Sequence, residues 1–174
     1  PVKSGTSDWI FKLFQELLKR DCNVELVTTN NREINLYLKK FIYKNKVHPL
    51  IDWNIFGIIR LIKLVKQMNP DIVHIEYPGG FGRLMRYEYR ILVSLFPLLI
   101  RVNGYTGKIF LRLHEFNEVM IITRIFASIL MFCVNKIAIA SKSDYEIIVK
   151  LFPFIEDKLE FIPSGSNIPY VIYS

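Results

Sequence analysis

The chain has 174 residues, 51% of them hydrophobic and 22% charged, and 23 basic residues against 16 acidic residues give it a formal net charge of +7. This length suits one ordinary domain with a sizeable core, and the composition excludes a disordered or low-complexity chain. The longest uncharged apolar stretches, Ile91–Ile100 and Ile125–Asn135, are shorter than the roughly 18–20 residues that cross a bilayer. We therefore expect no membrane span.

The cysteine content and the charge balance narrow the class of protein further. Two cysteines, Cys22 and Cys133, are too few for a disulfide framework or a structural zinc site, and no His or Cys pair has metal-ligand spacing. With no apolar secretory region at residues 1–5, we expect a cytoplasmic protein without a bound metal. The positive charge favours an anionic partner, either a phosphorylated ligand or an anionic membrane surface. Nucleic acid is not expected, because no binding motif accompanies the charge.

Short β-rich runs alternate with helical patterns along the chain. The expected strands are residues 24–29, 71–77, 108–115, 136–141 and 158–163. The expected helices are residues 7–20, 54–68, 83–100, 117–134 and 143–152, with Asn117 and Ser143 as N-caps of the last two. This alternation predicts an α/β fold, with a doubly wound, Rossmann-like parallel sheet and helices on both faces. Because the chain opens on a helix, we expect a leading strand before Pro1, and we expect Leu130, Phe132 and Ile139 to lie in the core.

In open parallel sheets, ligands bind beyond the carboxyl ends of the strands, so the expected strands predict the place of a site. The polar turns at those ends are Ser4–Thr6 (after the leading strand), Glu76–Gly80, His114–Asn117, Ser141–Ser143 and Pro163–Asn167. We expect these five turns to line one rim of the sheet.

Three residues are singled out on chemical grounds. Gly5, just before a helix, would let backbone N–H groups approach a phosphate; the alternative is a plain loop glycine with Ser7 as N-cap. His114 is the first residue of its strand that can face a ligand; the alternative is a strand-end histidine satisfied by nearby backbone. His74, in mid-strand on the same face as Glu76, is expected to be a hydrogen-bonded core residue.

Two basic clusters are candidates for anion or membrane binding. One mixes cations with apolar side chains, which suits an anionic lipid surface, and the other lies on one face of a helix. They are Lys39, Lys40, Lys44 and Lys46 in the first, and Arg83, Arg86 and Arg90 in the second. The alternative for each is an ordinary solvated face.

A series of motifs along the chain resembles the family-4 glycosyltransferases, which have the GT-B fold. They are PVKSGT at residues 1–6, CNVELVT at 22–28, NPDIVHIEY at 69–77, LRLHE at 111–115, IAIAS at 137–141 and FIPSGSNIP at 161–169. The resemblance covers nearly the whole chain, and within such an enzyme it covers the N-terminal, acceptor-side half. A second, donor-binding domain would follow, so we expect the 174-residue chain alone to be inactive.

The resemblance also implies an activity and roles for single residues. It implies transfer of a sugar from a nucleotide-sugar to a glycan or lipid-linked acceptor, with retention, without metal or cofactor, in surface polysaccharide or glycolipid synthesis at the inner face of the plasma membrane. His114 would be catalytic, Gly5, Thr6, Ser164 and Gly165 would bind the donor phosphates, and Glu76, Tyr77 and Glu115 would face the acceptor. The alternative is a non-catalytic accessory subunit that borrows the fold and docks on a catalytic partner.

Overall fold

The computed structural model of the chain describes residues 5–30, 44–52, 54–78, 87–114, 116 and 121–163. The chain divides into two compact units, one formed by residues 1–51 with 164–174 and the other by residues 52–163.

The first unit contains a helix and a pair of parallel strands. Its elements are α1 (Gly5–Lys19), β1 (Leu26–Thr29), the 3-10 helix η1 (Lys44–Lys46) and β2 (Val47–Ile51). β1 pairs with β2 from Leu26 opposite Val47 to Thr29 opposite Ile51. The sequence did not predict β2, because Pro49 lies in its middle and proline disfavours a central strand.

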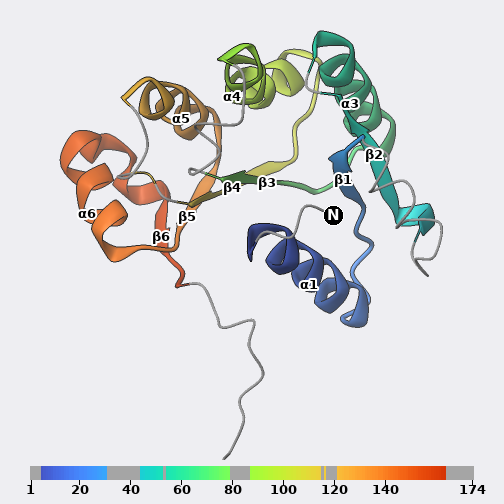
Figure 1. The fold of residues 1–174 in the computed structure, drawn as a ribbon, viewed down its shortest axis with the longest axis horizontal. Helices are drawn as coiled ribbons and strands as arrows, with labels where there is room; N and C mark the ends of the chain where they lie inside the picture. Colours follow the sequence, from blue (N-terminus) through green and yellow to red (C-terminus); the bar gives the residue numbers. More distant parts are fainter. Residues whose placement is uncertain are drawn as a thin grey trace, which may run out of the picture. The chain divides into compact units, whose positions relative to one another are not determined.

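The second unit is built on a four-stranded parallel sheet. Its elements are α3 (Ile55–Met68), β3 (Ile72–Pro78), α4 (Tyr87–Val102), β4 (Lys108–His114), α5 (Ile121–Cys133), β5 (Lys136–Ile139), α6 (Lys142–Leu151), the 3-10 helix η3 (Pro153–Lys158) and β6 (Leu159–Phe161). The strand order is β3-β4-β5-β6, with every neighbouring pair parallel. Figure 1 shows α3, α4 and α5 along one side of β3 and β4, with α6 beside β5 and β6. The expected α/β, Rossmann-like fold is confirmed.

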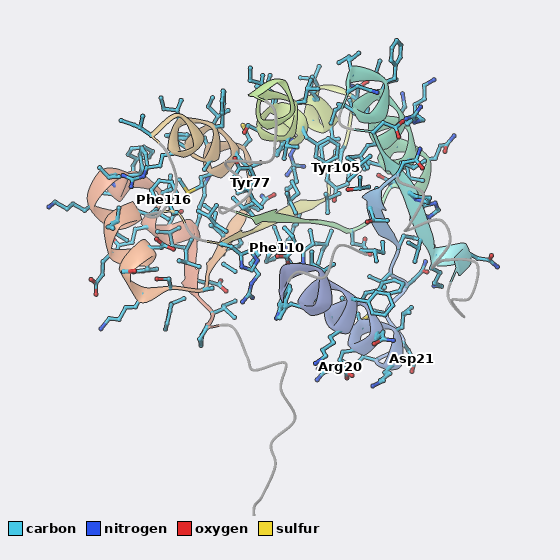
Figure 2. All side chains as sticks on the ribbon, in the orientation of Figure 1. Arg20, Asp21, Tyr77, Tyr105, Phe110 and Phe116 are labelled. Carbon is cyan, nitrogen blue, oxygen red and sulfur yellow. The ribbon has the colours of Figure 1, made fainter. Side chains whose placement is uncertain are left out.

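The core of this unit is formed by alternate residues of its strands, which point toward the helices. In β4, Ile109, Leu111 and Leu113 are buried against the helices, where they join Leu130 and Ile137 in one cluster. Figure 2 shows Tyr77 on the helix side of the sheet and Phe110 on the other side. The sheet therefore has an apolar face toward α4 and α5 and an opposite face that receives the alternate residues of each strand.

Two helices begin at polar caps. Asn54 precedes α3 and its side chain accepts a hydrogen bond of 2.9 Å from the Gly57 N–H. At α6 the expected N-cap, Ser143, is wrong: Ser141 has the extended backbone of a cap and its Oγ accepts from the Asp144 N–H, so Ser143 lies inside the first turn. The other expected cap, Asn117, lies outside the described residues.

One expected core residue is also wrong. Leu130 and Ile139 are fully buried, but Phe132 keeps 48% of its surface exposed, and its ring stacks on Phe154 of η3 at a centroid distance of 5.2 Å. Within the described ranges, no helix combines the length and the apolar character that crossing a membrane requires.

Candidate functional site

The candidate site lies where β3 and β4 end. The two strands run in register from Ile72 opposite Lys108 to Pro78 opposite His114, so both carboxyl ends reach the same edge of the sheet. Glu76 alternates with the buried Tyr77 and therefore lies on the face of β3 away from the helices. His114 lies on the same face of β4, one residue beyond the buried Leu113.

A carboxylate joins two imidazoles on this face. His114 Nε2 lies 2.9 Å from Glu76 Oε2, and His74 Nε2 lies 3.0 Å from Glu76 Oε1. The side chain of Glu76 is 10% exposed, that of His114 17% and that of His74 39%. We call His74, Glu76 and His114 the Glu76 cluster.

The charge of Glu76 is stabilised by its neighbours. Burial alone would raise the pKa of this carboxyl, but hydrogen bonds from His114 and His74, together with their positive charge when protonated, outweigh it and hold the pKa below its usual value. An ionised carboxylate only accepts hydrogen bonds, so His114 must carry a proton on Nε2 to bond with it. This bond fixes the orientation of the His114 ring.

Arg112 adds a buried cation to the same face. It is in register with Glu76, is 5% exposed, and its Nη2 donates to the Ile162 carbonyl at 3.4 Å. Arg112 was not among the predicted site residues. The signal that could have identified it is a charged side chain between Leu111 and Leu113 in an apolar strand, because a buried cation needs polar partners.

The turn after His114 is held by the first turn of α6. The Phe116 N–H donates to Asp144 Oδ2 at 3.1 Å, and Asp144 is 4% exposed. Ser141 caps α6, and its Oγ lies 2.7 Å from Ser143 Oγ. Sequence reasoning missed Asp144, although its signal was present in the spacing from Ser141, three residues before it.

The structure brings together two of the predicted site residues, His114 and Glu76. Tyr77, assigned to the acceptor side with Glu76, is 6% exposed and packs in the core on the opposite face. His74 lies 3.0 Å from Glu76 but its side chain is 39% exposed, so it is not the core residue that was expected. Within the four-stranded sheet of the second unit, β3 stands at the end of the strand order.

For the other predicted site residues, the structure gives at most the helix in which each residue lies. Gly5 and Thr6 form the start of α1, so Gly5 begins the helix instead of preceding it, and Ser7 is inside the helix instead of capping it. They belong to the first unit and His114 to the second. Lys44 starts η1 and Arg90 lies in α4. The others, Glu115, Ser164, Gly165, Lys39, Lys40 and Arg86, lie outside the described residues.

Comparison with known families identifies a similarity over the N-terminal half of the chain. A family model described as glycosyl transferase 4-like matches residues 2–95, which is more than half of the chain. This span includes β3 with His74 and Glu76 and ends before His114. Curated proteins give no significant match.

Proposed function

Because the chain belongs to the glycosyl transferase 4-like family, we propose that it is the acceptor-side, Rossmann-like domain of a glycosyltransferase. The donor is a nucleotide-sugar, the transferred group a hexose, and the acceptor a glycan or glycolipid in surface polysaccharide or glycolipid synthesis. The observation that carries the proposal is the Glu76 cluster, a charged and partly buried group at the carboxyl ends of two parallel strands. Ligands of open α/β sheets bind at this edge.

The proposed reaction exchanges one bond at the anomeric carbon of the sugar. The bond from this carbon to the diphosphate oxygen breaks, the acceptor hydroxyl oxygen bonds to the same face of the carbon, and the hydroxyl proton passes to the departing phosphate. His114 orients sugar hydroxyls while positive charge develops on the sugar ring. Glu76 supports this role, because a carboxylate bonded to one ring nitrogen fixes the tautomer and direction of an imidazole.

The test uses the protein at its full natural length, incubated with UDP-, GDP- and ADP-hexoses and a membrane lipid extract as acceptor. We expect sugar incorporation that a chelator leaves unchanged. We expect His114→Ala to lower kcat/KM at least about tenfold, equivalent to about 1.4 kcal/mol of transition-state stabilisation. His48→Ala is the matched control, because His48 also bonds a glutamate, Glu25, at 2.9 Å but belongs to the other unit.

Two results would count against the proposal. A His114→Ala variant as active as the native protein would remove His114 from the mechanism. Binding of a nucleotide-sugar without transfer to any acceptor would favour a non-catalytic accessory subunit.

The proposal includes a location at the inner face of the plasma membrane, without insertion. The residues proposed for this contact are Lys39, Lys40, Lys44, Arg86 and Arg90, whose side chains lie outside the described part of the chain. Replacing Lys39, Lys40, Lys44 and Lys46 with glutamine should abolish salt-sensitive binding to anionic liposomes, because the attraction of cations to anionic lipid is screened by salt.

A further inference from the structure

His114 is the last residue of β4, and the backbone around it is held at two points on the side of β5 and α6. The β4–β5 ladder ends at Leu113 opposite Ile139, one residue before His114. Two residues beyond His114, the Phe116 N–H donates to Asp144 Oδ2 at 3.1 Å. A side chain of α6 therefore takes over where the ladder stops, and His114 lies between the two points.

Asp144 serves a second element besides its own helix. It is the third residue of α6, which Ser141 caps, and a side chain at this position commonly reaches back to the N–H of the cap residue. Here Oδ2 accepts from a backbone N–H that lies 28 residues earlier in the chain. The carboxylate stays in the first turn of α6, where the partial positive charge of the helix start favours an anion. The helix thus presents a well-placed acceptor to the turn after His114.

Both partners of this hydrogen bond are buried, so water cannot replace either of them. Asp144 is 4% exposed and Phe116 is 1% exposed. The Phe116 ring belongs to the core cluster, and the guanidinium carbon of Arg124 lies 5.9 Å from the centre of this ring. A buried N–H that loses its acceptor is left unpaired, so the turn must shift to find another partner. Such a shift would move the end of β4 and His114 with it.

We propose that Asp144 is a positioning residue for His114 in sugar transfer, because it fixes the turn after β4 and so sets where the imidazole stands. The inference rests on the proposed function and adds to it a residue of α6. Glu76 holds the ring through the hydrogen bond to Nε2, whereas Asp144 holds the backbone that carries the ring. Because His114 orients sugar hydroxyls while charge develops, a small displacement affects the transition state more than the bound substrate.

The test compares variants of the protein at its full natural length, assayed with UDP-, GDP- and ADP-hexoses and a membrane lipid extract. Asp144→Ala removes the acceptor, whereas Asp144→Asn keeps one oxygen for the Phe116 N–H and removes the charge. Asp144→Ser is a second variant that loses the reach to Phe116, for use if the alanine variant does not fold. The matched controls are Ile148→Val and Ile148→Ala, because Ile148 is 0% exposed on the same helix and its truncation lowers stability by leaving a cavity.

We expect Asp144→Ala to lower kcat at least about tenfold and to change the KM of donor and acceptor less than about threefold. Asp144→Asn should keep kcat within about threefold of the native value, because its oxygen still accepts from the Phe116 N–H. The Ile148 control whose stability in urea unfolding matches that of Asp144→Ala should keep kcat within about twofold.

The decisive comparison repeats Asp144→Ala in the His114→Ala background. Because Asp144 acts through His114, its removal there should change kcat less than about twofold. A loss of kcat as large in this background as in the native one would overturn the inference, since it would show that the two residues act independently.

A second result would also overturn the inference while leaving the proposed function in place. It is a loss of kcat in Asp144→Ala that is no larger than the loss in the Ile148 control of equal stability, because general destabilisation would then account for the effect. A His114→Ala variant as active as the native protein would instead refute the proposed function, and the inference with it. The two failures are therefore distinguished by the activity of the His114→Ala variant alone.

Discussion

Replacing Glu76 with glutamine tests whether the Glu76 cluster is held together by charge. Glutamine keeps the shape and one acceptor oxygen, but it removes the negative charge and turns an N–H₂ group toward a ring nitrogen. A hydrogen bond to a charged group contributes about 1.5–3 kcal/mol when it is buried, which applies to the bond from His114. The contact with His74 is 39% exposed on the histidine side and adds at most about 1 kcal/mol after solvent screening. Allowing for the retained oxygen, we expect a loss of about 2 kcal/mol in the free energy of unfolding at neutral pH.

The pH dependence of this loss in the free energy of unfolding shows whether it comes from the charge of Glu76 or from the shape of its side chain. The folded pKa of Glu76 lies below its usual value, so its charge stabilises the fold above the unfolded pKa, and this contribution is lost as the pH falls through the folded pKa. Urea unfolding followed by circular dichroism from pH 7 to about pH 3 should therefore show a difference between native and variant protein that shrinks with acid. The control is Glu160→Gln, because Glu160 pairs with Lys136 at 3.2 Å where both side chains are about half exposed, and it should cost at most about 0.5 kcal/mol. A loss that is equal at all pH values would refute the electrostatic reasoning.

Two further substitutions test the packing at the two ends of β4, Gly107 just before its first residue and Phe116 just after its last. In Gly107→Ala, the new Cβ would meet the Tyr105 hydroxyl and lie 2.7 Å from the Pro70 carbonyl oxygen. Because a backbone oxygen cannot move away as a flexible side chain can, we expect thermal or urea unfolding to show a loss of about 1–3 kcal/mol in the free energy of unfolding. The control Thr106→Ala, at an exposed neighbouring position, should change this free energy little. In Asp144→Ala, the Phe116 N–H loses its buried acceptor. We therefore expect the free energy of unfolding to fall by about 1–3 kcal/mol and hydrogen exchange at the Phe116 amide to become faster. The control is Glu146→Ala on the same helix, whose partner Lys142 is 3.9 Å away at the surface, and it should change neither the free energy of unfolding nor the exchange rate.

Local sequence pattern predicted most of the helices and strands of the second unit. The alternation in residues 108–115 predicted a strand, and in the observed strand β4 (Lys108–His114) Ile109, Leu111 and Leu113 are buried on one face. The failures have local causes. β2 was not predicted because proline is disfavoured within strands, and Pro49 lies in the middle of it. The pairing of β2 with β1 depends on a contact between distant parts of the sequence, which local pattern does not show. Serine is a favourable N-cap residue at either position, 141 or 143. The extended backbone conformation that makes Ser141 the cap cannot be predicted from the residue types alone.

The site could be predicted residue by residue but not as a set of contacts. His114 was identified because it ends a strand, and Glu76 because it lies near the end of another. Their hydrogen bond depends on the register that places Pro78 opposite His114, and no pattern within either strand encodes that register. The role of His74 was misjudged for a different reason: mid-strand position predicts burial only when helices cover both faces of the sheet, and His74 lies on the face of β3 away from the helices of its unit.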